Sequence, residues 1–262
     1  MLVRIESSDN NRIKLVRKLQ NKKARDAENK LVIEGMNLVS EAIRRGIKTD
    51  FVMVSDEFDG GQFLEDIKTG DSVLVCEVAA SVFNKITDAD NGVGILAVID
   101  KNAITPDDIG TLPADANVLV LDRLQDPGNI GTMIRTAVAT GYELIVCVKG
   151  TADVFSPKVL RATAGMIFDI PIIYVSNAAE LKAMMSQAGK RFVVTTVDGG
   201  RPYYEEDLKT GIALVIGNEG NGVSDEVLEL ADVRVTIPMK GEIESLNAAI
   251  SAAILMYEAV RE

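Results

Sequence analysis

The sequence predicts an α/β protein of two domains, with a mostly parallel sheet in the second. Three observations support this fold class. Strand-like runs of β-branched residues alternate with helical patterns along the whole chain. The 262 residues are 47% hydrophobic but only 5% aromatic, which predicts an aliphatic core. Residues 101–115 interrupt the alternation with proline, glycine, aspartate and threonine, a composition typical of a linker.

The first domain, residues 1–100, begins with apolar residues in helical order. Ile13, Val16 and Leu19 fall on one face, which predicts a helix over residues 9–28 with basic side chains on its other faces. Strands are expected at 31–34, 51–54, 72–76 and 94–98, and helices at 36–45, 62–68 and 79–86. Short elements in this alternation predict a small α/β layer domain.

The second domain, residues 116–262, opens with Asn117 to Leu121, an apolar run typical of a central parallel strand. Further strands are expected at 144–148, 170–175, 192–197, 213–216 and 233–237, and helices at 129–140, 157–162, 178–188 and 224–230. We expect Ser245 to cap a last helix that runs to about Val260. The pattern predicts a doubly wound sheet, which binds ligands outside the carboxyl ends of its strands.

The composition excludes several classes of site. The chain has no histidine, so the commonest general base and metal ligand is missing, and no metal is expected. Cys76 and Cys147 lie in apolar runs and are expected to be buried thiols, as in a reducing cytoplasm. No signal peptide is visible and no apolar run approaches the roughly 20 residues that span a bilayer. We therefore expect a soluble, cytoplasmic protein.

The charge is distributed unevenly. The chain carries a net charge of −11, but residues 1–48 hold 12 Lys and Arg against 6 Asp and Glu, a net of +6. Such a basic arm on an acidic body is either a solvated amphipathic helix or a surface that contacts phosphates. On the second interpretation the phosphate-contacting residues are Arg12, Arg17, Lys18, Lys22, Lys23 and Arg25.

Three loops of the second domain carry polar residues that a plain connector does not need. They are Asp126 to Gly131 before a helix, Gly217 to Gly222 after a strand, and Ile237 to Ala249 between the last strand and helix. The glycines let a ligand approach the backbone closely, but they match neither the dinucleotide fingerprint nor a P-loop. We expect the three loops to converge on one site.

Three side chains in or near these loops each have a structural and a functional interpretation. Glu219 lies between glycines, where a carboxylate is either hydrogen-bonded or catalytic. Arg135 is either a surface ion-pair residue or part of the site. Asn247 either caps the last helix or contacts a ligand.

In this order the loops resemble the three motifs of SpoU-type (TrmH-like) RNA 2′-O-ribose methyltransferases of the SPOUT superfamily. The motifs read Asn129-x-Gly131-x-x-x-Arg135-x-Ala137, then Gly217-Asn218-Glu219-Gly220-x-Gly222, then Ile237-Pro238-Met239-x-Gly241-x-x-Glu244-Ser245-Leu246-Asn247-x-Ala249. Also similar to the family are Phe155-Ser156-Pro157-Lys158-Val159-Leu160-Arg161, Ala164-Gly165 and Thr195-Thr196-x-x-Gly199. One departure is Val223, where the family usually has leucine. Residues 1–98 resemble the family's L30/L7Ae-like substrate-binding domain.

The resemblance implies a fold with a deep C-terminal trefoil knot, a homodimer, and S-adenosylmethionine held by the knotted loops. The last helix and the helix of the first motif would supply the dimer interface. The implied cofactor-binding residues are Thr196, Gly217, Asn218, Glu219, Gly220, Ile237, Met239, Ser245 and Leu246.

The implied reaction is methyl transfer to a ribose 2′-hydroxyl. The family points to Arg135 as the group that activates the hydroxyl. Because an arginine stays protonated, we expect it to stabilise the developing alkoxide while a substrate phosphate or Glu219 takes the proton. Asn129, Ser245 and Asn247 would orient these groups.

The L30-like domain favours ribosomal RNA as the substrate, by analogy with ribosomal RNA binders. The alternatives are a transfer RNA 2′-O-methyltransferase and a non-catalytic RNA-binding or ribosome-assembly factor on the same fold. A nucleotide-dependent oxidoreductase is disfavoured, because the glycine fingerprint is missing.

Overall fold

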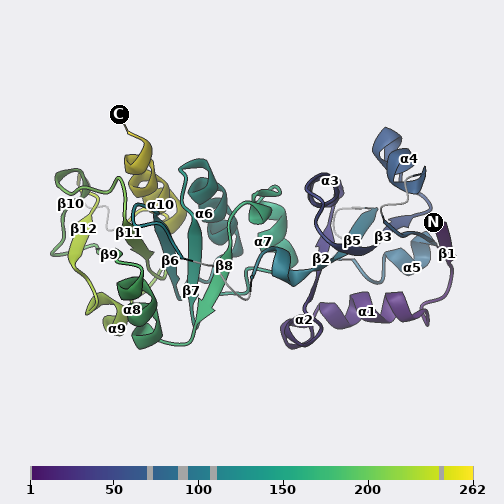
Figure 1. Ribbon diagram of the computed structural model, residues 1–262, viewed down its shortest axis with the longest axis horizontal. Coiled ribbons are helices and arrows are strands. Elements are labelled where there is room, and N and C mark those ends of the chain that lie inside the picture. Colours follow the sequence, from purple (N-terminus) through teal and green to yellow (C-terminus); the bar gives the residue numbers. More distant parts are fainter. Residues whose placement is uncertain (1, 70–72, 88–93, 107–110, 242–244, 262) are drawn as a thin grey trace. The chain divides into compact units, whose positions relative to one another are not determined.

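The chain folds into two compact units in the computed structural model, which describes residues 2–69, 73–87, 94–106, 111–241 and 245–261 (Figure 1). The first unit contains Met1–Ala103 and Phe155–Phe168, and the second contains Ile104–Val154 and Asp169–Glu262. The chain first passes between the units at Ala103 and Ile104, inside the predicted linker of residues 101–115. The return of Phe155–Phe168 to the first unit was not predicted.

The first unit contains a five-stranded mixed sheet. Its strands are β1 (Leu2–Ile5), β2 (Lys30–Glu34), β3 (Thr49–Ser55), β4 (Val75–Val78) and β5 (Ile95–Asp100), in the order β1-β4-β3-β5-β2. Its helices are α1 (Asn11–Leu19), α2 (Lys22–Glu28), α3 (Met36–Arg44), α4 (Gly61–Thr69), α5 (Ala80–Phe83) and α7 (Pro157–Ala162), with short 3-10 helices η1 (Lys101–Ala103) and η2 (Met166–Phe168). β1, β4 and β3 run parallel, whereas β5 is antiparallel to both of its neighbours. The sequence patterns missed β1.

The predicted helix over residues 9–28 was wrong in one respect, because two helices occupy this region. Asn10 caps α1 by accepting a hydrogen bond from the Arg12 backbone at 2.9 Å, and Asn21 caps α2 in the same way. An asparagine side chain that bonds to the backbone favours such a helix start over continuation. Ile13, Val16 and Leu19 are buried against the sheet, as the periodicity predicted.

Helix α7 packs on β2 within the first unit. Val159 and Leu160 of this helix are buried, and Arg161 approaches the buried Glu34 carboxylate at 3.7 Å. At Gly165 a Cβ atom would lie 2.9 Å from Glu41 Cγ, so the missing side chain permits close packing. This segment is therefore an integral part of the first unit.

The second unit is built on a seven-stranded sheet in which every described pairing is parallel. The strands are β6 (Val118–Asp122), β7 (Leu144–Val148), β8 (Ile172–Val175), β9 (Arg191–Thr195), β10 (Arg201–Pro202), β11 (Ile212–Ile216) and β12 (Val233–Thr236), in the order β10-β12-β9-β11-β6-β7-β8. The helices are α6 (Pro127–Ala139), α8 (Ala178–Gln187), α9 (Asp225–Leu228) and α10 (Ala248–Met256), with 3-10 helices η3 (Tyr203–Glu205) and η4 (Tyr257–Val260). The predicted mostly parallel α/β fold is confirmed, although β10 and η3 were missed.

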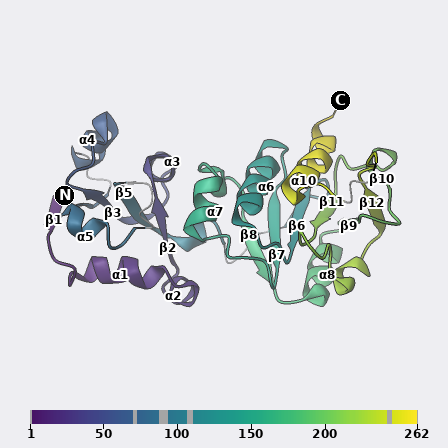
Figure 2. The same cartoon turned by 180° about the vertical axis from the view of Figure 1, so that it is seen from behind.

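Helices cover both faces of this sheet (Figures 1 and 2). α6 packs against α10 on one face, and α8 and α9 lie on the other. Along β6, Val118 and Val120 pack with Leu181 and Met185 of α8, so the intervening Leu119 points to the opposite face. Burial on both faces explains why these strands read as continuous apolar runs. The trefoil knot stays a prediction.

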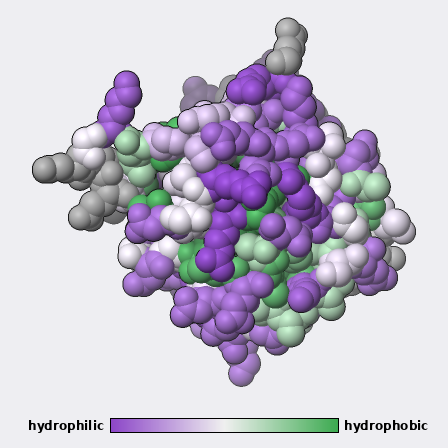
Figure 3. Space-filling model, turned by 90° about the vertical axis from the view of Figure 1, so that its left-hand side faces the viewer, coloured by the Kyte–Doolittle hydropathy of each residue, from purple (hydrophilic) through white to green (hydrophobic). Residues whose placement is uncertain are grey.

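The surface on the side of β10 and β12 is mostly hydrophilic, with scattered hydrophobic patches (Figure 3). Across the described ranges, none of the helices combines the length and the apolar character that crossing a membrane requires.

Candidate methyltransferase site

The three predicted loops emerge at one edge of the second sheet. β6, β11 and β12 are parallel members of this sheet; a loop follows β11 and β12 directly, and the first loop begins four residues after the end of β6. Because the carboxyl ends of parallel strands share an edge, the loops come within hydrogen-bonding distance of one another.

The first loop places Asn129 in the first turn of α6. Asp126 is the N-cap, and its carboxylate accepts a hydrogen bond from the Asn129 backbone at 2.8 Å. Pro127 occupies the first helical position, which its fixed φ and missing N–H favour. The helix therefore begins two residues before the predicted start, and the Asp-Pro pair was the signal for it.

Glu219, in the second loop, joins the first. Its carboxylate accepts hydrogen bonds from the Asn129 side chain at 3.1 Å and from the backbone N–H groups of Asp126 at 3.2 Å and Gln125 at 3.3 Å. Sequence patterns did not reveal that backbone donors at Gln125 and Asp126 belong to the site. Of the two interpretations of Glu219, the hydrogen-bonded one is observed.

These donors determine the protonation state of Glu219. Partial burial raises the pKa of the carboxyl, but the Asn129 side chain and the backbone N–H groups outweigh that effect, so the pKa lies below its usual value. Glu219 is therefore an anion at neutral pH and a weaker proton acceptor than an ordinary glutamate.

Asn247 connects the third loop to the other two. Its side-chain N–H donates to Asn129 Oδ1 at 2.9 Å, and its own Oδ1 accepts from the backbone of Ala249 and Ile250 at the start of α10. The expected N-cap, Ser245, was wrong, because α10 begins two residues further on, with Asn247 in the capping position. Asn247, Asn129 and Glu219 thus form one hydrogen-bonded chain across three loops.

The glycines of the second loop allow a tight reversal. Gly217 is buried, and a Cβ atom there would overlap the backbone of Gly222 and Val223, lying 2.6 Å from the Gly222 oxygen. Asn218 and Gly222 exchange two backbone hydrogen bonds of 2.9 Å, and the Asn218 side chain donates to the Arg123 carbonyl at 2.9 Å. Gly220 is exposed and has no such crowding.

Arg135 lies in α6, about two turns beyond Asn129, and is exposed. No described residue forms an ion pair with it, so the surface ion-pair interpretation has no support in the described ranges. A cation that is not committed to a carboxylate is available to a ligand.

The comparisons with known proteins decide the family. Residues 116–257 match the model of the SpoU rRNA methylase family, which is more than half of the chain. The chain belongs to this family. Residues 10–97 also match the MRM3-like substrate-binding domain.

Individual SpoU relatives align along nearly the full length. The 23S rRNA (guanosine(2553)-2′-O)-methyltransferase RlmP of Bacillus subtilis is 37% identical over 256 residues, 97% of each chain. The AdoMet-bound rRNA methyltransferase of Sinorhizobium meliloti has a TM-score of 0.83 and 32% identity, covering 98% of this chain and 97% of its own. AviRb of Streptomyces viridochromogenes, crystallised with AdoMet, has a TM-score of 0.86 and 27% identity, covering 96% and 97%.

These matches confirm three predictions: the SpoU family, the mostly parallel α/β fold class and an RNA methyltransferase. Two of the structural relatives hold AdoMet, the cofactor expected from the sequence. In the described part of the chain, no three Cys, Asp or Glu side chains are grouped as metal ligands.

The predicted cofactor residues of this SpoU chain surround the same sheet edge. Ile237 and Met239 are half-buried and Leu246 is 37% exposed, so apolar side chains face outward at the carboxyl end of β12. Thr196 follows β9, and its backbone N–H donates to Val235 at 3.0 Å. Partly exposed apolar side chains are suited to pack against an adenosine moiety, which is flat and amphiphilic. Glu244 of the third motif lies outside the described residues.

The predicted RNA-binding residues have different surroundings. Arg17, Lys22 and Lys23 are exposed, Arg12 lies 6.0 Å from the centre of the Phe51 ring, and Lys18 pairs with Glu28.

Arg25 has a structural role instead. It is only 4% exposed, and its guanidinium donates to the Leu19 and Gln20 carbonyls at 2.9 Å each. It closes the turn between α1 and α2, so we leave it out of the RNA-binding surface.

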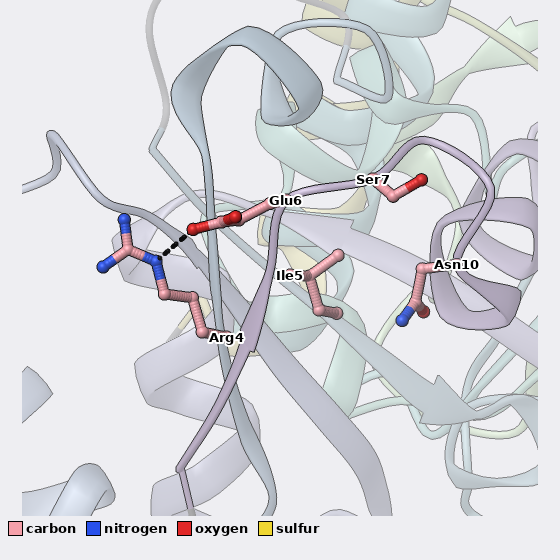
Figure 4. Close-up of a pocket in the computed structure, with 5 residues that line it drawn as sticks. All are labelled: Arg4, Ile5, Glu6, Ser7 and Asn10. Atoms are coloured by element: carbon pink, nitrogen blue, oxygen red, sulfur yellow. Dashed lines mark ion pairs between the residues drawn. The ribbon is translucent and has the colours of Figure 1, made fainter.

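A small cavity of about 370 Å³ lies elsewhere, in the first unit after β1 (Figure 4). Arg4, Ile5, Glu6, Ser7 and Asn10 line it. Arg4 and Glu6 pair with each other at 3.0 Å, and none of the motif residues contributes. We assign this cavity no role in the methyltransferase site.

Proposed function

We propose that the protein transfers a methyl group from S-adenosylmethionine to a ribose 2′-hydroxyl of ribosomal RNA. The observation that supports this most is the hydrogen-bonded chain Asn247–Asn129–Glu219, which joins the three motif loops beside α6. The name of the Bacillus subtilis relative supports a 23S-type substrate. The substrate-binding domain at residues 10–97 supports RNA as the partner.

S-adenosylmethionine would supply an electrophilic methyl group on its sulfonium. Thr196, Gly217, Asn218, Glu219, Gly220, Ile237, Met239, Ser245 and Leu246 are the proposed binding residues. In this assignment the glycine turn admits the ligand to the backbone, and the apolar side chains cover its adenine.

Arg135 is the proposed activating group. Its guanidinium would donate to the 2′-oxygen and stabilise the negative charge that develops as the proton leaves. The two candidate proton acceptors are a substrate phosphate and Glu219, whose carboxylate already accepts hydrogen bonds from Asn129 and two backbone N–H groups. Glu219 and Asn247 then orient Asn129, while Ser245 keeps the orienting role proposed from its motif.

Replacing Asn247 by aspartate separates its two roles. Aspartate caps a helix as well as asparagine does, so the free energy of unfolding should change by less than about 1 kcal/mol. A carboxylate oxygen of the aspartate would then face Asn129 Oδ1, and the hydrogen bond that the Asn247 amide donates to this atom would be lost. We expect methyl transfer to fall at least about tenfold, as measured by tritium incorporation from labelled cofactor into RNA.

Asn247→Ala is the matched comparison, because it removes both the cap and the contact with Asn129. If Asn247→Asp keeps full activity while Asn247→Ala loses stability, Asn247 is only a helix cap.

The basic arm of the first unit would hold phosphates of the RNA. The proposed contacts are Arg12, Arg17, Lys18, Lys22 and Lys23. Replacing Arg17 and Lys23 by glutamate should weaken RNA binding and lower the salt slope of log K by about two, because each lysine or arginine releases about one counterion. Filter binding over a series of salt concentrations measures both quantities.

The control variant replaces Arg44 and Lys48 by glutamate. These two residues are exposed cations of the same unit, and they pair with Glu41 and Asp100. An equal loss of affinity in both double variants would show that only net charge matters and that the arm is a solvated surface.

We further propose a cytoplasmic homodimer with the knotted topology of the family. Ile250, Tyr257 and Val260 of α10 and η4 are each more than half exposed, and burial in a dimer would remove this apolar surface from water. Light scattering during gel filtration tests the dimer. Mapping 2′-O-methyl sites in ribosomal and transfer RNA, with and without the gene, tests the substrate and separates an enzyme from a non-catalytic assembly factor.

A further inference from the structure

A second cavity, which is basic, lies in the catalytic unit, and no residue of the three motif loops lines it. It has a volume of about 640 Å³ and lies where β7 and β8 end, against α8 and α9. Its charged lining consists of Arg123, Lys149, Lys182 and Glu226, and Ser176 and Ser224 add hydroxyl groups. The loop after β8 leads directly into α8 (Figure 1).

The charge of this cavity is opposite to that of its surroundings. The segments 104–154 and 169–262 hold 11 basic and 22 acidic residues, a net of −11, whereas the cavity carries a net of +2. Lys149 and Lys182 are exposed, and neither forms an ion pair with a described residue. Cations left uncommitted on an acidic unit attract an anionic ligand.

Three hydrogen bonds hold the backbone of Arg123 at a φ of 59°, which L-residues rarely adopt. Its N–H donates to Thr151 Oγ1 at 3.1 Å, and its carbonyl accepts from the side chains of Asn218 at 2.9 Å and Gln125 at 3.0 Å. At Gly150 a Cβ atom would lie 3.1 Å from Arg123 Cγ, so this glycine leaves room for the side chain. Strain that is held this firmly is typical of functional positions.

The same contacts connect the cavity to the methyltransferase site. Gln125 bonds to the Arg123 carbonyl with its side chain and to Glu219 with its backbone N–H. Asn218, next to Glu219, bonds to the same carbonyl. The cavity is therefore fixed in position relative to the proposed catalytic chain.

Two features compete with a bound anion. The Glu226 carboxylate pairs with Arg123 at 3.1 Å, but both side chains are more than half exposed, so the pair is weak and a phosphate could replace it. The first turn of α8 is already capped by Asn177, while Glu180 binds the Ser176 N–H, so the helix terminus is not part of the argument.

We propose that this basic cavity binds a phosphate of the RNA chain beside the target nucleotide, an assignment that rests on the proposed function. Arg123 would contact the phosphate through its fork of N–H groups, and Lys149 and Lys182 would add charge. RNA is favoured over a free anion because the cavity is open, exposed and fixed to the methyltransferase loops.

The test is a pair of variants with opposite expected effects. Lys149→Gln/Lys182→Gln should weaken binding of a ribosomal RNA fragment about tenfold near 0.1 M salt and lower the salt slope by between one and two. Glu226→Gln should tighten binding, because it removes the only carboxylate that the cavity's described lining contains. Affinity for S-adenosylmethionine and turnover at saturating RNA should stay at the wild-type level in both variants.

The outcomes are distinct. Unchanged RNA affinity and salt slope in an active double variant would overturn the cavity assignment and leave the proposed function intact. A wild-type protein that methylates no ribosomal RNA would overturn the proposed function by itself. If inorganic phosphate raises the Tm of the wild type but not of the double variant, while RNA affinity is equal, the cavity takes a free anion and the proposal is wrong.

Discussion

Arg135→Ala should lower the rate of methyl transfer at least about 10³-fold, because the variant loses the cation proposed to stabilise the developing alkoxide. Binding of S-adenosylmethionine should survive, since the proposed binding residues lie in other loops. Single-turnover transfer from labelled cofactor measures the first quantity, and isothermal titration calorimetry measures the second. Arg135→Lys keeps the charge but loses the guanidinium fork, so an intermediate rate is expected.

Lys209→Ala is a matched control for charge. Lys209 is exposed and precedes β11, so it lies at the amino end of a strand and away from the motif loops. Near-normal turnover by Arg135→Ala, or an equal loss in Lys209→Ala, would contradict the assignment of Arg135.

Gly217→Ala should weaken cofactor binding by about 10- to 100-fold. The added Cβ would meet the backbone of Gly222 and Val223, which cannot rotate away as a side chain can, so the turn must open. Overpacking of this kind costs about 1–3 kcal/mol, and it displaces the loop on which Glu219 contacts Asn129. Calorimetry with S-adenosylmethionine and thermal unfolding measure the two effects.

Gly220→Ala provides the comparison within the same loop. A Cβ atom there would meet only Asn218 Oδ1, at an ordinary 3.6 Å, and the backbone conformation suits any residue. Its Tm should match that of the wild type. If both alanine variants unfold and bind alike, the tight turn at Gly217 is not what organises the site.

Much of the fold could be predicted from local patterns. The central strands β6, β7 and β11 of the second unit are buried on both faces, so each forms a continuous apolar run between polar loops, and their parallel order follows from the intervening helices. The three motif loops could be found because glycine, asparagine and glutamate have no structural reason to gather after buried strands. Asn129, Glu219 and Asn247 indeed contact one another.

What could not be predicted depends on contacts distant in sequence or on competition between neighbours. Ser245 and Asn247 are both good N-cap residues, and only the path of the backbone decides that Asn247 caps α10. Arg25 looks like one more cation of a basic helix, but the turn at Gln20 brings two carbonyls to its guanidinium. No periodicity reveals such a choice.

The return of Phe155–Phe168 to the first unit has a consequence for how this protein can be divided. The SpoU family match runs through residues 116–257, so a fragment cut there would carry α7 without β2, on which it packs. Val159 and Leu160 would then face water, at a cost of about 2 kcal/mol each. Cleavage inside residues 104–115 should leave two pieces that stay associated through α7, whereas separate expression of the halves should give an aggregation-prone catalytic fragment. We therefore expect the catalytic fragment of this chain to depend on the first unit for the burial of α7, although the two parts match two different family models.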